Sequence, residues 1–458
     1  MKESLIVEQL LSDPRVEQAR SLLLDAVKEH SAKIDITHGP LSSKKQSYEE
    51  TLKLFGKQRG GNLWYPYLGS GVGNGALVEL ADGSVKYDFV CGIGPNYFGH
   101  SHPLIVESAI DAALGDTTHQ GNLQQNVDSA DLTKLIVKAA KMDHLFLTTS
   151  GSVAVENGLK IAFQSRYPAS RVLAFENCFC GRTLGATQIS DRPQYRQGIP
   201  STLDVDYIPF YDESDPQGSI KRTIAALKKH LSRYPCQHAA MIFELVQGEG
   251  GFYPGTTAFF EAIMQVLKDE NILIIIDEVQ SFARTPELFA FHHFNLEKFA
   301  DIVIIGKAAQ VCGTLFTDAV KPRPGLLSQT FTSSTAAIRS GYAIISNLMN
   351  DGYFGPEGKI SSLHNYLAQN FENMHSRHPE IISGPYGLGA MTAFTPFKGE
   401  AKATIEIAHA LFDAGLITFV AGHDPMRIRL LLPIGALTFE DCDNAVAIIE
   451  KTLLKHKA

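Results

Sequence analysis

The sequence predicts an α/β fold, with a mainly parallel central sheet sandwiched by helices and joined to a smaller α+β domain. Three observations predict it. Between about residues 105 and 320, short Val, Ile and Leu runs alternate with amphipathic segments, as expected for strands buried on both faces of a parallel sheet. Beyond about residue 345, longer helical segments alternate with short strands. At 458 residues the chain is long enough for two packed domains.

The first 60 residues predict a polar helical segment. Apolar residues recur at helical spacing in VEQARSLLLDAVKEH, and Ser47 with Glu50 fits a capping box that opens a second helix. The following stretch, LGSGVGNGALVELADGSVKYDFV, has the glycine density of a dinucleotide-binding loop. Such a loop must follow a strand and open a helix. Here the pattern predicts two strands joined by a turn at Ala81-Asp82-Gly83.

The remaining elements follow in order. Predicted helices include PLIVESAIDAAL and SADLTKLIVKAA, and predicted buried strands are HLFLTT, RVLAF, AAMIFELV, ILIIID and DIVII. In the last part of the chain, IEIAHALFDAG and FEDCDNAVAIIEKTLLKH predict helices, whereas AMTAFTP and MRIRLLL predict strands. We place an N-terminal helical segment at 1–60, the first part of a small domain at 61–100, the large domain at 101–342 and the rest of the small domain at 343–458.

Composition excludes several classes of protein. With 44% hydrophobic and 20% charged residues the chain resembles a soluble globular enzyme, and its net charge of −8 offers no basic surface for nucleic acid or an anionic membrane. The six cysteines are irregularly spaced and form no CxxC, so neither a disulfide framework nor a metal site is expected. Because no signal peptide and no membrane span are recognisable, we expect a cytoplasmic protein without membrane or nucleic-acid partners.

Two charged residues directly follow buried strands. Asp277 ends the run ILIIID, and Lys307 follows DIVIIG. Ligands gather at the carboxyl ends of parallel strands, so both residues can converge on one pocket. The alternatives are a buried salt bridge between them or two separate solvated loops.

Other residues favour the pocket. Ser150, Gly151 and Ser152 stand between a strand and a helix, which is either an anion site of free backbone N–H groups or an ordinary helix cap. Phe179 follows another strand and can stack on a planar ring, and Glu244 follows a third. A lysine, a carboxylate, an anion cradle and an aromatic platform together describe a site for pyridoxal phosphate.

The same residues carry a family resemblance. The motifs DEVQSFART…ADIVIIGKA and SGSVAVENGLKIA occur with FCGRT, ELVQGEGG and GIGPNYFGHSHP in a fixed order. Over roughly residues 75–435 this order resembles the class III (ω-amino) aminotransferases, a family of fold-type I pyridoxal-phosphate-dependent transferases. KAAQVCG is locally similar to lysine 6-aminotransferases. The resemblance implies transfer of a terminal amino group from a diamine or ω-amino acid to a 2-oxo acid such as 2-oxoglutarate.

The resemblance also implies roles for individual residues. Lys307 and Asp277 would be catalytic: Lys307 forms the Schiff base with the cofactor, and Asp277 pairs with its pyridine nitrogen. The other implied cofactor contacts are Gly151 and Ser152 at the phosphate, Phe179 and Val279 on the two ring faces, and Gln280 near the ring hydroxyl. Thr330 matches a threonine that reaches the phosphate of the neighbouring subunit, which implies a homodimer with shared active sites.

Substrate contacts complete the expected site. Arg429 resembles the arginine that binds a substrate carboxylate, and Glu249 matches the glutamate that can hold this arginine aside. Glu244 is a further substrate-binding candidate. Arg182 either contacts substrate or anchors its own loop.

The chain departs from the family pattern at several positions. Cys180 stands where a histidine is usual, Leu245 where a proline is usual, and the loops at 281–283 and 332–335 are altered. These changes surround the cofactor residues and leave the reaction open. The alternatives to an aminotransferase are an aminomutase or a decarboxylase that uses the same site, or a cofactor-binding homologue without catalysis.

Overall fold

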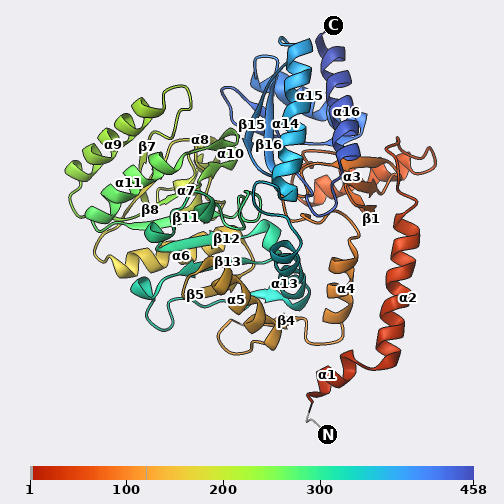
Figure 1. The fold of residues 1–458 in the computed structure, drawn as a ribbon, viewed down its shortest axis with the longest axis horizontal. Helices are drawn as coiled ribbons and strands as arrows, with labels where there is room; N and C mark the ends of the chain where they lie inside the picture. The colour runs from red at the N-terminus through yellow and green to blue at the C-terminus, as the bar shows by residue number, and fades with distance from the viewer. Residues whose placement is uncertain (1–3, 120, 458) are drawn as a thin grey trace. The chain divides into compact units, whose positions relative to one another are not determined.

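A computed structural model describes residues 4–119 and 121–457. The chain divides into two compact units, which we call the terminal and the central unit. The terminal unit combines Met1–Gly115, Leu363–Pro385 and Thr392–Ala458, and the central unit combines Asp116–Ser362 and Tyr386–Met391. Figure 1 shows the elements of both units along the chain.

The central unit is built on a large sheet. Within the described residues, seven strands lie in the order β5-β13-β12-β11-β8-β6-β7. Their bounds are His144–Thr148 (β5), Arg171–Phe175 (β6), Asp204–Ile208 (β7), His238–Phe243 (β8), Leu273–Glu278 (β11), Ile302–Ile305 (β12) and Cys312–Phe316 (β13). Strand β13 runs antiparallel to both of its neighbours, and the other pairs are parallel. The predicted mainly parallel sheet is confirmed, although β7 and β13 were not anticipated.

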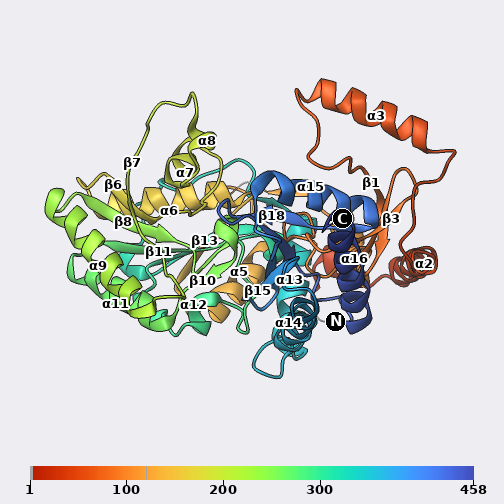
Figure 2. The ribbon, with the colours of Figure 1, turned by 90° about the horizontal axis from the view of Figure 1, so that it is seen from above.

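Helices cover both faces of this sheet. The longer ones are α5 (Val127–Ala140), α6 (Gly151–Ser165), α9 (Pro216–Arg233), α11 (Thr257–Asp269) and α13 (Thr335–Asn350). Helix α6 lies along one face, and α9 and α11 lie along the other (Figure 2). The shorter elements of the unit are β4 (Thr118–His119), α7 (Leu184–Ile189), α8 (Pro193–Arg196), β9 (Val246–Gln247), α10 (Gly248–Gly251), β10 (Tyr253–Pro254), α12 (Ala290–His293), η1 (Glu297–Phe299), η2 (Lys307–Ala309), η3 (Asp318–Val320) and β14 (Ser333–Ser334).

Strand register brings the chemically important residues together. Every residue of β8, β11 and β12 is buried, because helices on both faces leave no solvated side. Ile276 of β11 pairs with Phe243 of β8, and Asp277 pairs with Ile304 of β12. The positions just beyond β8 and β12 therefore lie beside Asp277, at the carboxyl edge of the sheet.

The terminal unit contributes most of two smaller sheets. In the described residues, one has the order β1-β2-β3-β17 and the other β15-β16-β19-β18. The strands are β1 (Gly69–Asn74), β2 (Leu77–Leu80), β3 (Val85–Asp88), β15 (Ile382–Leu388), β16 (Met391–Pro396), β17 (Leu416–Ile417), β18 (Phe419–Ala421) and β19 (Arg427–Leu431). The helices are α1 (Ile6–Leu11), α2 (Pro14–Ser31), α3 (Lys45–Gln58), α4 (Pro103–Ala112), α14 (Lys359–Arg377), α15 (Ala401–Ala414) and α16 (Phe439–Lys457).

Two local expectations for the first 90 residues fare differently. The turn at Asp82-Gly83 is confirmed, since β2 and β3 pair as an antiparallel hairpin around it, and the glycine-rich stretch before it forms β1. The capping box at Ser47 and Glu50 is wrong. Helix α3 already begins at Lys45, and the Ser47 hydroxyl donates to the backbone oxygen of Lys44 at 3.0 Å instead of capping the helix.

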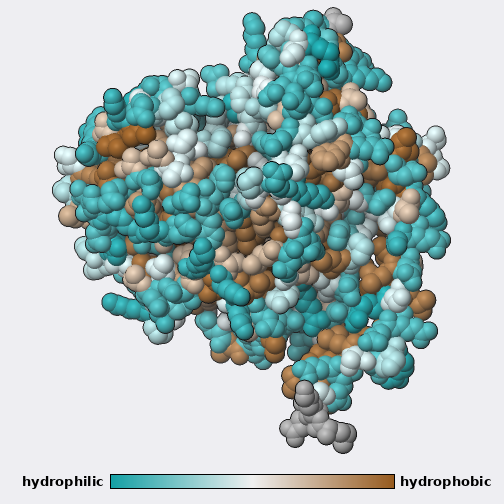
Figure 3. All heavy atoms as spheres, in the orientation of Figure 1, coloured by the Kyte–Doolittle hydropathy of each residue, from teal (hydrophilic) through white to brown (hydrophobic). Residues whose placement is uncertain are grey.

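The N-terminal helices leave apolar side chains exposed. Ile6 of α1 is 77% exposed, and Leu22 and Leu23 of α2 are also exposed. Hydrophobic atoms are visible on this part of the surface in Figure 3, amid mostly hydrophilic surroundings. None of the helices within residues 4–119 and 121–457 is long and apolar enough to span a bilayer.

Candidate active site

A cavity of about 180 Å³ opens at the carboxyl edge of the large sheet. Nine of the twelve predicted site residues line it, and all of them belong to the central unit. They are Gly151, Ser152, Phe179, Arg182, Glu244, Asp277, Val279, Gln280 and Lys307, joined by Cys180 and Gly181. Residues up to 156 positions apart in sequence therefore meet in one place, as the strand order predicts.

The carboxylate of Asp277 is buried at the end of β11. Its Oδ1 accepts the backbone N–H of Val279 at 2.9 Å. Burial raises the pKa of Asp277 from 3.8 to about 6, although the Val279 N–H and the charge of Lys307 both lower it. The carboxylate therefore remains mostly ionised at neutral pH.

Lys307 lies just beyond β12 in an unusual backbone conformation. Its φ is 48°, in the left-handed region that costs a residue with a side chain about 1 kcal/mol or more. The preceding Gly306 permits the close packing here, because a Cβ at that position would lie 2.9 Å from the Sγ of Cys312. Such strain is typical of functional positions.

The N-terminus of α6 reaches the cavity through Gly151 and Ser152. Ser150 caps the helix by accepting the N–H of Val153 at 3.3 Å, and Gly151 and Ser152 form the first turn, where backbone N–H groups lack partners within the helix. A Cβ on Gly151 would lie 2.9 Å from Cγ1 of Val279, so only glycine lets the helix approach Val279, the residue just after β11, this closely. The Ser152 oxygen accepts the N–H of Arg182 at 3.1 Å and can still donate its proton to an anion.

Glu244 connects the aromatic loop to the turn after β8. Its carboxylate accepts the N–H of Phe179 at 3.2 Å and the N–H of Gly248 at 2.9 Å. Burial, followed by the nearby charge of Asp277, raises the pKa of Glu244 from 4.5 to about 8. Two buried carboxyl groups thus lie close together beside the cavity.

Three predicted site residues do not line this cavity. Thr330 lies exposed between η3 and β14, and Glu249 lies on α10, where its backbone oxygen accepts from Nη2 of Arg192 at 2.7 Å. Arg429 belongs to the terminal unit. It is fully buried on β19, with its guanidinium 5.1 Å from the ring centre of Phe419 on β18.

Two lining residues, Cys180 and Gly181, were not among the predicted contacts. Burial and contact with Cys178 raise the pKa of the Cys180 thiol, with the Cys178 contact the larger cause, so Cys180 stays protonated at neutral pH. A Cβ on Gly181 would lie 2.2 Å from Oγ of Ser152. Their position directly after Phe179 was the available signal. Among residues 4–119 and 121–457, no three His, Cys, Asp or Glu side chains gather as a metal site requires.

Comparisons with known proteins agree with this geometry. The family model for class-III aminotransferases matches residues 69–453. An acetylornithine aminotransferase from Caldanaerobacter subterraneus subsp. tengcongensis is 27% identical over 393 residues, covering 83% of this chain and 93% of the relative. The structure of acetylornithine aminotransferase from Elizabethkingia anophelis is 27% identical, with a TM-score of 0.72 and coverage of 89% and 99%. Lysine aminotransferase from M. tuberculosis, 22% identical, gives a TM-score of 0.76 with coverage of 83% and 93%.

The layered sheet and the lysine at its carboxyl edge define the fold-type I class of pyridoxal-phosphate enzymes. The chain belongs to the class III aminotransferases, and pyridoxal phosphate is its cofactor. The cavity fits this group. The first turn of α6 offers N–H donors for a phosphate, Asp277 a carboxylate for a ring nitrogen, and Lys307 an amine for an aldehyde.

Proposed function

We propose that this aminotransferase moves a terminal amino group from a diamine or ω-amino acid to a 2-oxo acid such as 2-oxoglutarate. The observation that carries the proposal is the convergence of Lys307, Asp277 and the first turn of α6 on one cavity. The similarity to acetylornithine aminotransferases supports a donor that carries its reacting nitrogen at the end of a chain.

The predicted residues that line the cavity each have a proposed task. Bound pyridoxal phosphate supplies an aldehyde that takes up the donor's nitrogen and a ring that withdraws electrons from the adjacent carbon. Lys307 would hold the cofactor through its Nζ, and its amine would carry a proton to and from that carbon. Asp277 keeps the ring nitrogen protonated. Gly151 and Ser152 bind the phosphate, and the remaining proposed cofactor contacts are Phe179, Val279 and Gln280.

Four residues are proposed to contact substrate. Arg182 and Glu244 line the cavity itself. Arg429 and Glu249 are proposed on the family resemblance, Arg429 as the ligand of a substrate carboxylate and Glu249 as its regulator. We therefore expect that the second half of the reaction, in which a dicarboxylate acceptor takes the amino group from the enzyme, depends on Arg429.

The decisive experiment is the visible absorption spectrum of the purified enzyme during titration with single amines. We expect one terminal amine to remove the absorption band of the lysine-bound cofactor, and 2-oxoglutarate to restore it. Release of carbon dioxide from one of the amines in the absence of a 2-oxo acid would indicate a decarboxylase instead. A band that no amine changes would refute amino transfer.

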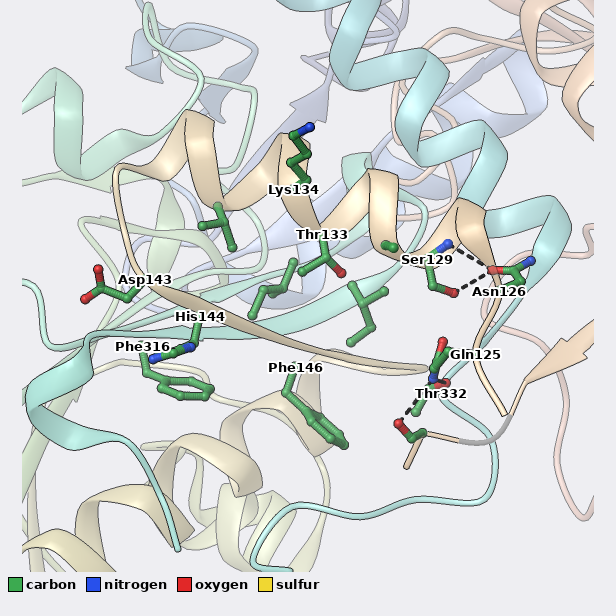
Figure 4. A pocket seen from close by; sticks show the side chains of 15 residues that line it. Gln125, Asn126, Ser129, Thr133, Lys134, Asp143, His144, Phe146, Phe316 and Thr332 are labelled. Atoms are coloured by element: carbon green, nitrogen blue, oxygen red, sulfur yellow. Dashed lines mark hydrogen bonds between the residues drawn. The ribbon is translucent and has the colours of Figure 1, made fainter. Parts of the chain in front are cut away.

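We also propose a homodimer, for which an apolar surface of the central unit is the supporting feature. Leu123, Val127 and Phe331 are 83%, 66% and 63% exposed, and their two segments are joined by a hydrogen bond from Nε2 of Gln125 to Oγ1 of Thr332 at 3.3 Å. An adjacent pocket of about 600 Å³ is lined by residues of α5 and β5 (Figure 4). Large exposed apolar groups beside a concave surface are typical of an interface.

Thr330 lies next to Phe331 on this surface, so a partner subunit seated there would meet it. We therefore propose Thr330 as the contact with the partner's cofactor phosphate.

Leu123→Asp is expected to shift the enzyme toward monomers in sedimentation velocity, because it places a charge in the interface. Leu454→Asp, on an exposed position of α16, is the control and should leave the mass unchanged. An unaltered mass for Leu123→Asp would contradict this interface. A cytoplasmic location stays a prediction.

A further inference from the structure

A short segment around α8 connects two loops of the active site. Asn177 donates its N–H to Oδ2 of Asp191 at 2.9 Å, and Asp191 donates its own N–H to the backbone oxygen of Cys178 at 3.0 Å. On the other side, Arg192 donates to the backbone oxygen of Glu249 at 2.7 Å. Residues 191–196 are thus hydrogen-bonded both to the loop before Phe179 and to α10, which carries Glu249.

Tyr195 is the residue of α8 that faces the cavity residues. The guanidinium carbon of Arg182 lies 3.8 Å from the centre of the Tyr195 ring. The Phe179 ring meets Tyr195 edge to face, with 6.2 Å between ring centres. Both Arg182 and Phe179 line the cavity, whereas Tyr195 does not. One ring therefore contacts both the cationic and the aromatic side chain of the cavity.

This contact reduces the conformational freedom of the Arg182 side chain. An exposed arginine side chain samples many rotamers, and ordering it on ligand binding costs free energy. The backbone of Arg182 is already held, because its N–H donates to Oγ of Ser152 at 3.1 Å. A ring stacked on the guanidinium restrains the rest of the side chain and leaves the edge of the guanidinium, with its N–H donors, available for a carboxylate.

We propose that Tyr195 is a positioning residue that holds the Arg182 guanidinium at the cavity, where it binds a carboxylate of the substrate. The inference deepens the proposed function and rests on it for the role of Arg182. It predicts that Tyr195 acts on carboxylate-bearing ligands, through Arg182 and not through the cofactor.

The test is a double-mutant cycle on the holoenzyme with glutarate, a dicarboxylate without an amino or oxo group. Binding is measured by isothermal titration calorimetry for wild type, Tyr195→Leu, Arg182→Ala and the double variant. Loss of the stacking ring is expected to raise the Kd of glutarate about 3- to 10-fold. In the Arg182→Ala background the same substitution should change the Kd less than about 1.5-fold, because the group it positions is absent.

Tyr195→Phe is the matched control, since it keeps the ring and loses only the hydroxyl. It should bind glutarate within about twofold of wild type, because a phenyl face also attracts a guanidinium. The visible cofactor band and the far-ultraviolet circular dichroism of every variant should match wild type. A purely structural role for Tyr195 would instead change the band, or weaken binding equally with and without Arg182.

The outcomes separate this inference from the proposed function. Coupling between Tyr195 and Arg182 in an enzyme that transfers no terminal amino group would support the inference and refute the function. Amino transfer with no coupling would refute the inference alone. Glutarate that fails to bind the wild-type holoenzyme, or a Tyr195→Leu variant that binds it unchanged, would also overturn the inference.

Discussion

The two edges of the large sheet differ in how their charged side chains are paired. At the amino edge, Asp301 precedes β12 and forms an ion pair with Lys268, at 2.7 Å between Nζ and Oδ1. At the carboxyl edge, Lys307 follows the same strand and lies at the cavity with Asp277. The four residues of β12 therefore separate a lysine–aspartate ion pair from a lysine and an aspartate that line a cavity.

The same contrast holds for the neighbouring strands. At the amino edge, Asp206 receives hydrogen bonds from Arg171 at 2.8 Å and from His238 at 2.8 Å. Burial acts to raise the pKa of Asp206, but the bonds from Arg171 and His238 outweigh it and leave that pKa below its usual value. At the carboxyl edge, burial dominates and raises the pKa of both Glu244 and Asp277.

The difference shows what distinguishes a structural site from a functional one here. Charges that stabilise the fold are neutralised by partners of the same chain. The two carboxyl groups at the cavity accept hydrogen bonds from backbone N–H groups, but burial outweighs these bonds and, at Asp277, also the charge of Lys307. The raised carboxyl pKa values of Glu244 and Asp277 therefore coincide with the cavity that these residues line.

The largest expected effect separates the two lysines. Lys307→Ala should lower kcat by at least about 10⁴-fold, because the amine that holds the cofactor and moves the proton is lost. Lys268→Ala should leave kcat within about twofold, and should lower the free energy of unfolding by at most about 1 kcal/mol, since its pair is partly solvated. Steady-state kinetics and urea unfolding measure both. Normal turnover by Lys307→Ala would show that Lys307 has no catalytic role and does not differ from Lys268 in this respect.

The aspartates provide the second contrast. Asp277→Asn should reduce kcat by about 10²-fold or more, because an uncharged amide no longer keeps the ring nitrogen protonated. Its stability should change little. Asp206→Asn should instead cost about 3 kcal/mol of unfolding free energy, since it leaves Arg171 without its buried counter-charge. Its kcat at a temperature well below unfolding should match wild type.

The smallest expected effect concerns pH. Glu244 has its pKa raised from 4.5 to about 8, so between these values the folded protein holds a proton that the unfolded chain releases. Its contribution to the free energy of unfolding therefore falls as pH rises through this window, by up to about 1.4 kcal/mol per pH unit. Asp206, with a lowered pKa, contributes stability above the unfolded value, which is lost only in acid.

Urea unfolding between pH 6 and 7 measures this contrast. Glu244→Gln should flatten the pH dependence by about one proton, whereas Asp206→Asn should leave its slope in this range unchanged. Equal slopes for wild type and Glu244→Gln would show that Glu244 is ionised in the folded protein.

Much of this site was accessible from sequence because its residues sit at marked local positions. Asp277 and Lys307 each end an apolar run, and Gly151 and Ser152 open a helix directly after a strand. Tyr195 carries no such mark. It belongs to a polar stretch, and its contact with Arg182 depends on how the 191–196 segment is tied across two loops.

From sequence, most strands of the large sheet and the polar groups that follow them were predictable, because periodicity and apolar runs are local properties of the chain. Strands β7 and β13 were missed. The position of β13 between β5 and β12, antiparallel to both, became clear only from the folded chain. The tertiary structure also decided which charges found partners within the chain. Strand order and ion pairing depend on contacts between distant residues, and no local pattern encodes which distant segments will meet.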